Sequence, residues 1–192
     1  MKKIFTLTLF ILLCVYLFNS LPFIYNETRP YFLNNINKNE CINVLNKIKI
    51  DFKYLGDIKN NQCIIKNAVK INHYPNTTMS SPITMSCMSA KKLGDYFNSI
   101  KASSIVHYGT YNCRQIRKSG YISEHGFGTA IDIASIDSAS VQKDWNKETQ
   151  KGFILKEASE VATNFYTNVI TPDTNAAHHN HLHLDSGIGL GN

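Results

Sequence analysis

The chain has 192 residues, of which 43% are hydrophobic and 18% charged, a composition typical of a globular protein and not of a disordered or fibrous one. The formal net charge of +6 would suit an anionic partner, but the lysines are scattered and form neither a basic run nor an alternation of arginines with aromatic residues, so we predict no nucleic-acid binding. Once an apolar N-terminal segment is set aside, the length leaves one compact domain with room for one active site.

The N-terminus carries an export signal. Lys2 and Lys3 precede an apolar stretch from Ile4 to about Phe18 that resumes at Leu21, and positive residues ahead of an apolar run direct secretion. The stretch is long for the core of a signal peptide, lacks an Ala-x-Ala cleavage site, and approaches the ~20 residues that span a bilayer. We therefore favour an uncleaved anchor, with a cleaved signal peptide as the alternative. The predicted parts are the anchor or signal peptide over residues 1–25, a polar linker over 26–40, and a folded domain over 41–192.

Five cysteines occur in the chain. Cys14 lies within the apolar run without the small residues of a lipoprotein cleavage site, so we interpret it as a thiol buried in the anchor. The other four form no Cys-x-x-Cys pair, which argues against a zinc ribbon or a thioredoxin-type site. In an oxidising compartment they predict two disulfides, with three possible pairings left open. These disulfide candidates are Cys41, Cys63, Cys87 and Cys113.

Apolar periodicity and turn residues predict helices and strands in irregular order. Gly56 is interpreted as a turn, and a cap near Thr84 or Ser86 begins the most regular helix. The irregular order predicts an α+β fold, with a single domain in which helices flank a small antiparallel sheet. The predicted elements are a helix over 41–48, a strand or hairpin over 63–71, a helix over 85–100, strands over 104–108 and 130–134, a helix over 149–166, and a short strand over 181–185.

Histidines are concentrated near the C-terminus, where four of them fall within residues 178–183, while His125 stands alone. On a strand, His181 and His183 would share one face and the intervening leucine would enter the core. Asp132 lies on the strand after His125, and glycines between the two allow the chain to curl so that they converge. Imidazole and carboxylate are the usual ligands of catalytic zinc. We therefore predict a zinc site on the sheet, against the alternative of a solvated histidine-rich loop.

Three segments, residues 109–114, 123–134 and 172–185, resemble the extensin-like protein C-terminal domain family of bacteria. Residues around Cys41, Cys63 and Cys87 fit as well, so the resemblance covers nearly everything after the linker. That family is similar in turn to a group that contains lysostaphin, D-Ala-D-Ala carboxypeptidases, the penicillin-insensitive murein endopeptidase and the hedgehog signalling domain. The pattern of this group is His-x6-Asp followed by His-x-His.

The resemblance implies zinc bound by His125, Asp132 and His183. It also implies that His181 handles protons and that His178 is an additional active-site histidine. Arg114 would lie near the scissile carbonyl, where it would stabilise the oxyanion with His178, and Ser123 would contact substrate. Glu124 and Asp185 are candidates for orienting an imidazole through its outer nitrogen. The family often has a cysteine where this chain has Thr163, which leaves the partner of Cys113 in doubt.

The resemblance further implies a zinc-dependent peptidase of the bacterial cell envelope. Its substrate would be the peptide of peptidoglycan, cleaved as an endopeptidase or a carboxypeptidase, and the chain would lie in the periplasm, anchored in the inner membrane. One alternative is a non-catalytic zinc domain that binds wall peptide or a protein partner. Another is a disulfide-stabilised structural domain with incidental histidines.

Overall fold

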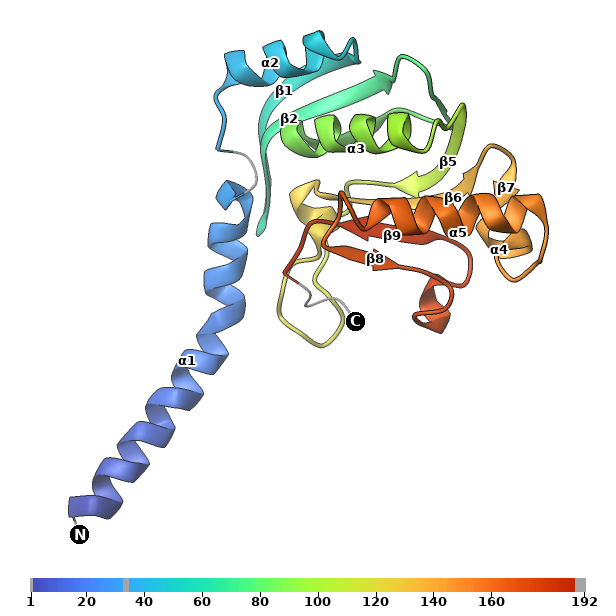
Figure 1. Ribbon diagram of the computed structural model, residues 1–192. Helices are drawn as coiled ribbons and strands as arrows, with labels where there is room; N and C mark the ends of the chain where they lie inside the picture. Colours follow the sequence, from blue (N-terminus) through green and yellow to red (C-terminus); the bar gives the residue numbers. More distant parts are fainter. Residues whose placement is uncertain (1, 33–34, 189–192) are drawn as a thin grey trace.

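The computed structural model describes residues 2–32 and 35–188, which form two β-sheets, the helices packed on them, and a long N-terminal helix that projects from the domain (Figure 1). The helices are α1 (Lys2–Phe32), α2 (Lys38–Lys47), α3 (Cys87–Ser99), α4 (Val141–Asp144), α5 (Gln150–Ala162) and the 3-10 helices η1 (Glu124–Phe127) and η2 (Ala176–His178). The strands are β1 (Asp51–Asn60), β2 (Cys63–His73), β3 (Thr78–Met79), β4 (Ile83–Ser86), β5 (Ser104–Gly109), β6 (Ala130–Ile136), β7 (Ala139–Ser140), β8 (Asn168–Ile170) and β9 (Leu182–Asp185).

The strands form two sheets. The first has three antiparallel strands in the order β1-β2-β4. The second has six, in the order β3-β5-β6-β9-β8 with β7 paired to β6, and is antiparallel except for the short β3–β5 pair. The prediction of an α+β fold with antiparallel pairing and flanking helices is confirmed. Instead of one small sheet there are two, because the β1–β2 hairpin pairs with β4.

The core lies between the sheets and helices α3 and α5. Along β6, Ile131 and Ile133 are fully buried, and Leu182 and Leu184 of β9 are buried beside them. Side chains alternate between the two faces of a strand, so the residues between these apolar ones point to the opposite face of the sheet. That alternation places the polar residues of β6 and β9 together, outside the core.

Some element boundaries differ from the predictions. Gly56, with φ of +79°, lies inside β1 between two register shifts, so its left-handed backbone serves a β-bulge and not a turn. Helix α5 begins after Thr149, as predicted, but ends at Ala162 instead of continuing to Tyr166. Tyr166 still packs edge-on against a core ring, which explains why the apolar periodicity runs past the helix end.

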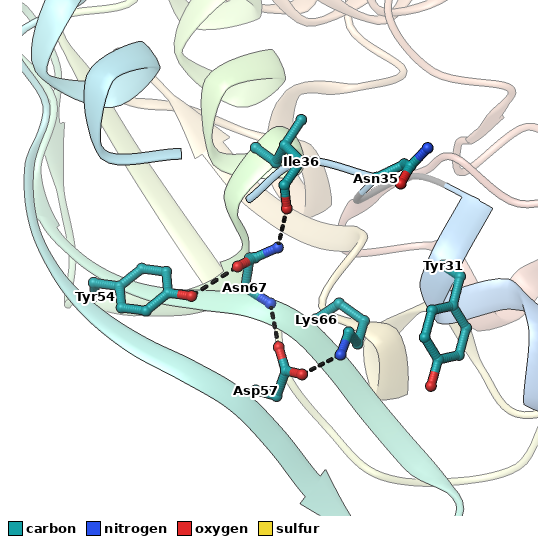
Figure 2. A pocket seen from close by; sticks show the side chains of 7 residues that line it. All are labelled: Tyr31, Asn35, Ile36, Tyr54, Asp57, Lys66 and Asn67. Carbon is teal, nitrogen blue, oxygen red and sulfur yellow. Dashed lines mark hydrogen bonds and ion pairs between the residues drawn. The ribbon is translucent and has the colours of Figure 1, made fainter. Parts of the chain in front are cut away.

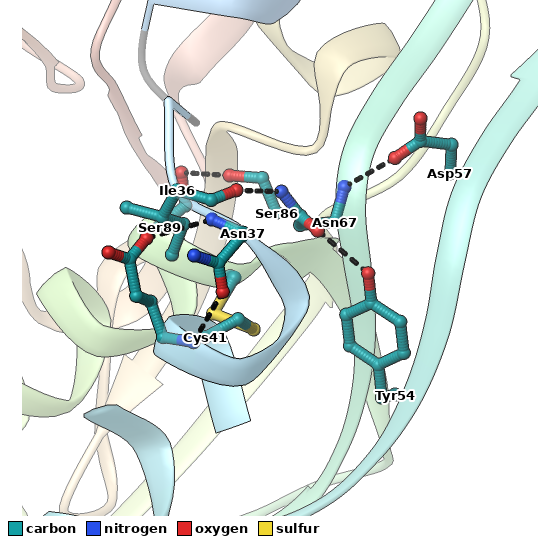
Figure 3. The surroundings of a disulfide bond; sticks show 10 residues. Ile36, Asn37, Cys41, Tyr54, Asp57, Asn67, Ser86 and Ser89 are labelled. Atoms are coloured by element: carbon teal, nitrogen blue, oxygen red, sulfur yellow. Dashed lines mark hydrogen bonds between the residues drawn. A yellow bond between two sulfur atoms is a disulfide. The ribbon is translucent and has the colours of Figure 1, made fainter. Parts of the chain in front are cut away.

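Two disulfides join the four predicted cysteines, and they settle the pairing that the sequence left open. Cys41 of α2 bonds Cys87 at the start of α3, where a capping box at Asn37 fixes the first turn of α2 (Figure 3). Cys63 of β2 bonds Cys113 in the loop after β5. Cys113 therefore pairs within the first half of the domain and needs no cysteine in α5.

Helix α1 continues further than the predicted anchor. A stretch of 23 residues, Phe10–Phe32, is long and apolar enough to cross a membrane, and most of its residues are exposed. Residues 26–32, predicted as part of a linker, are helical, and Asn26 and Arg29 are buried against the domain. An apolar N-terminal helix together with disulfides indicates an extracytoplasmic protein with a signal sequence or a membrane anchor.

A cavity of about 620 Å³ lies between the end of α1 and the β1–β2 hairpin (Figure 2). Its polar groups are paired with one another. The Tyr54 hydroxyl donates to Asn67 Oδ1, Asn67 Nδ2 donates to the carbonyl of Ile36, and Lys66 pairs with Asp57. Because these polar groups bond to one another, we interpret the cavity as structural: its hydrogen bonds hold the segment that leads into α2.

Candidate metal centre

Strands β6 and β9 bring Asp132 and His183 together. The two residues are direct partners in the antiparallel ladder, and side chains of such partners stand about 5 Å apart on the same face. Asp132 Oδ1 lies 2.8 Å from His183 Nδ1. The alternation predicted from the sequence thus places an acid and an imidazole side by side on the face opposite the core.

The third residue, His125, comes from the 3-10 helix η1. Ser123 caps this helix by accepting from the backbone N–H of His125, and Gly128 ends it with φ of +64°. The ring of His125 then points at the pair on the sheet. Its Nε2 lies 3.2 Å from His183 Nδ1 and 3.3 Å from Asp132 Oδ2.

These three side chains form a convergent donor set. Each offers one ligand atom, and the three atoms lie within 4.8 Å of one another. The outer nitrogen of each imidazole is held by a separate acceptor. His125 Nδ1 donates to the carbonyl of Thr110, and His183 Nε2 donates to Asp185 Oδ2, both at 2.8 Å. Such an outer partner fixes the tautomer and turns the lone pair of the other nitrogen inward, as in protein metal sites.

Burial and mutual proximity shift the pKa values in the cluster. Burial would raise the pKa of Asp132, but hydrogen bonds and charge from His125 and His183 hold it well below its usual range. Burial likewise opposes the charged form of His183, yet its hydrogen bonds to Asp132 and Asp185 raise its pKa to about 9. The pKa of Asp185 is lowered despite burial, mainly through His183. In the absence of a metal, the cluster therefore holds a proton on His183 between two carboxylates.

Two further histidines flank this donor set. His181 lies directly before β9, which begins one residue later than predicted. Its Nε2 lies 3.6 Å from Asp132 Oδ1. Its Nδ1 lies 2.8 Å from Asn180 Oδ1. His178 ends η2 and its Nδ1 lies 2.6 Å from Asn175 Oδ1. Both imidazoles therefore have one nitrogen held by a neighbouring amide oxygen.

Burial lowers the pKa of both flanking histidines. For His181 burial is the largest cause; the charge of Asp132 opposes it, and the charges of His183 and His125 act in the same direction as burial. For His178 burial, with charge on His181 and His183, lowers the pKa to about 4. Neutral imidazole is thus favoured at both positions.

A cleft of about 450 Å³ opens over the cluster. The structure brings the predicted Arg114 and Ser123 to its wall together with His178 and His181. Arg117 lines the same wall and escaped prediction because a lone arginine in a loop carries no pattern. Ser123 has a second task, since its side chain caps η1.

Glu124 does not take the predicted role beside an imidazole. Its carboxylate pairs with Arg29 of α1, and Thr129 Oγ1 donates to it at 2.5 Å. Of the two predicted orienting acids, only Asp185 contacts a histidine ring, His183.

Other contacts at the site have no signal in the sequence. The carbonyl of Thr110 is a backbone atom, so its identity leaves no trace in the residue type. Tyr108 stacks edge-on against His181 with ring centroids 5.8 Å apart. Asn175, which holds His178, could have been suspected from its place three residues earlier, since asparagine often bonds locally in turns.

Comparison with known families gives one match. The family model described as extensin-like protein C-terminus matches residues 39–189. This range contains both disulfides and the metal-type cluster, which is the donor set of His125, Asp132 and His183. Searches among curated proteins and among solved structures found no match. The family description names no metal and no reaction. Because the matched range covers more than half of the chain, this protein belongs to the extensin-like protein C-terminus family.

Proposed function

We propose that this protein is a zinc-dependent peptidase that hydrolyses a peptide bond in the stem or cross-link peptide of peptidoglycan. The observation that carries the proposal is the donor set of His125, Asp132 and His183, whose inward atoms converge while both outer nitrogens are held. The domain would act in the bacterial periplasm, to which the apolar N-terminal segment directs it.

The donor set suits zinc better than a hard cation. Two imidazole nitrogens and one carboxylate are typical of catalytic zinc sites, which keep a position open for water or substrate. A zinc ion held there supplies a Lewis acid that polarises a carbonyl and makes water a nucleophile near neutral pH. His125 and Asp132 would bind it through Nε2 and a carboxylate oxygen, and His183 through Nδ1.

His181 is placed to move the proton. Its Nδ1 is committed to Asn180, so the lone pair on Nε2 is available on the side that faces Asp132. In the proposed reaction Nε2 accepts a proton from the attacking water and returns it to the nitrogen of the leaving amine as the C–N bond breaks. His178, held by Asn175 and packed against the ring of His181 with centroids 4.8 Å apart, keeps that ring in place.

The wall of the cleft favours a substrate with negative charge. Arg114 and Arg117 both line it and both are exposed, and guanidinium groups bind carboxylates through paired hydrogen bonds. Stem peptides of peptidoglycan carry free carboxylates. Arg114 would hold the oxygen of the scissile carbonyl as it gains charge, and Arg117 a carboxylate further along the peptide.

The experiment uses the full chain, produced with its disulfides and purified in detergent. Bound metal is measured by mass spectrometry, and the protein is incubated with purified peptidoglycan, whose products are identified by their masses. His183→Ala is expected to lose the metal and the cleavage, and His181→Ala to keep the metal and lose cleavage. His179→Ala is the matched control, because His179 is exposed and its ring bonds the carbonyl of Ala176.

The outcomes separate the possible functions. About one zinc per chain together with cleavage supports the proposal, and the product masses identify the bond. Zinc without cleavage of any wall preparation would replace the peptidase with a zinc domain that binds wall peptide or a protein partner. Absence of metal in the unaltered chain would overturn both.

A further inference from the structure

The last turns of α1 are docked on the domain through a buried ion pair. Arg29 Nε and Nη2 donate to the two oxygens of Glu124 at 2.8 and 2.6 Å, and Nη2 also donates to the carbonyl of Ser186 at 2.6 Å. The side chains of Arg29 and Glu124 are only 5% and 6% exposed. A buried charge is tolerated only when it is paired and hydrogen-bonded, so each of these two residues requires the other.

Neighbouring residues of α1 add further contacts. Asn26 accepts from the backbone N–H of Ile122 at 2.7 Å and donates to the carbonyl of Gly120 at 3.1 Å. The hydroxyl of Tyr25 donates to Glu124, and its ring packs edge-on against Tyr121 with centroids 5.4 Å apart. This segment of α1 therefore contacts the loop between β5 and η1, and the donors and acceptors of the helix side chains pair with acceptors and donors of the loop.

The rest of α1 has the opposite character. The large apolar residues from Phe10 to Phe18 are each at least half exposed, and Figure 1 shows this part of the helix projecting away from both sheets. Some 20 residues precede Pro22, which at 1.5 Å per residue span about 30 Å, the thickness of the hydrocarbon core of a bilayer. One helix thus combines an apolar half that fits lipid with a polar half that fits this domain.

We infer that α1 is retained in the mature protein as a membrane anchor and that its segment from Pro22 to Arg29 is a fixed part of the cleft. The apolar half takes the lipid bilayer as its partner. Tyr25 contributes to the wall of the cleft beside the metal-type cluster, so the cleft opens directly next to the membrane surface. Cleavage after Tyr25 would remove the part of this wall that Tyr25 forms, and cleavage after Arg29 would also leave Glu124 buried without its partner.

A disulfide trap tests the docking without relying on metal or activity. An ideal Cβ at Gly120 would lie 3.5 Å from Cβ of Pro22, and disulfides join Cβ atoms about 3.5–4.5 Å apart. In a Cys14→Ser background, the pair Pro22→Cys and Gly120→Cys is expected to cross-link when the full chain is expressed in a Gram-negative envelope. The matched control replaces Phe23, 66% exposed on the same helix, with cysteine in combination with Gly120→Cys, and should not cross-link.

A second measurement protects the test against a variant that fails to fold. The intact mass of the unaltered chain, extracted from the membrane fraction of the same host, is expected to include the apolar half of α1 before Pro22 as well as residues 22–29. In the trapped pair, Arg29→Ala is expected to lower the cross-linked fraction several-fold, whereas Glu27→Ala, on the exposed side of the helix, leaves it unchanged. A mature chain that lacks the apolar half of α1 before Pro22, or equal cross-linking in the Pro22 and Phe23 pairs, would overturn the inference.

Discussion

Asp185 holds the outer nitrogen of His183. Its Oδ2 lies 2.8 Å from Nε2, while the Nδ1 of the same ring faces Asp132 Oδ1 at 2.8 Å. The other oxygen of Asp185 accepts from Asn168 Nδ2 and from the backbone N–H of Gly187. The ring of His183 is therefore fixed by a carboxylate whose own orientation is fixed by two donors.

Asp185→Asn is expected to weaken zinc binding about 10- to 100-fold, the usual effect of losing such an outer partner. An amide cannot accept on both sides, so its NH₂ group must face either His183 or the donors on Asn168 and Gly187. Competition with a chromogenic chelator measures the affinity. Asp173→Asn, at an exposed carboxylate that pairs with Lys156, should leave it unchanged, and equal affinities for the two variants would contradict the expectation.

Zinc binding is expected to release about one proton from His183 at pH 7.5. The pKa of this residue is raised to about 9 in the metal-free protein because Asp132 and Asp185 outweigh its burial, so the ring is protonated below that pH and must lose a proton to bind. Affinity should then rise about tenfold per pH unit up to about 9. Calorimetry in two buffers of different ionisation enthalpy counts the protons, and heats that do not depend on the buffer would exclude this coupling.

Gly128→Ala should destabilise the domain by at least about 2 kcal/mol, since a strained backbone and a buried clash add. The position has φ of +64°, and a Cβ would lie 2.9 Å from Ile65 Cδ1 and 3.0 Å from backbone atoms of Met85 and Ser86. Urea unfolding measures the change. Gly56→Ala, where φ is +79° and the nearest atom to a Cβ would be Tyr54 Cε1 at 4.0 Å, has a similar positive φ without the clash and should cost less.

Arg29→Ala is expected to lower the free energy of unfolding of the full chain by about 3–5 kcal/mol, because it leaves the carboxylate of Glu124 buried and unpaired. Lys91→Ala serves as the comparison. Lys91 pairs with Asp95 at 2.5 Å, but those side chains are 35% and 37% exposed, and an exposed pair of this kind contributes about 0.3–0.5 kcal/mol. Chemical unfolding in detergent measures both, and a loss at Arg29 no larger than that at Lys91 would show that α1 is not docked.

Replacing Cys63 and Cys113 with alanine should lower the stability by about 2–4 kcal/mol, as expected for a disulfide that closes a long loop. Zinc affinity should fall as well, because Cys63 packs under η1: a Cβ at Gly126 would lie 2.9 Å from its Sγ. Cys14→Ser, at an exposed cysteine of α1 that forms no disulfide, is the control. Thermal unfolding and chelator competition on both variants give the two readouts.

The metal-type cluster could be predicted because it depends on local periodicity. Period-two alternation puts Asp132 and His183 on the polar face of two strands whose apolar residues enter the core. The glycines at 126 and 128 indicated a tight curl, and η1 supplies it. Asp185 could be predicted for the same reason, since it lies two residues after His183 on one strand.

The remaining contacts depend on long-range packing that local pattern does not encode. Glu124 directly precedes His125, but neighbouring residues in a 3-10 helix point about 120° apart, and Glu124 pairs with Arg29 of α1. Its partner Arg29 lies 95 residues earlier. The pairing of Cys63 with Cys113 was open because spacing alone does not determine which cysteines meet.

The step from Glu124 to His125 has an evolutionary consequence. The residue that receives the anchor and a residue of the metal-type cluster are neighbours on η1, so a change that displaces this 3-10 helix affects both. Among relatives, positions 29 and 124 should co-vary: lineages that replace the acid should also replace the arginine, while position 125 stays histidine. A lineage that has lost the helix should then carry an uncharged residue at 124, so the residue at this position would record whether the domain still works at a membrane.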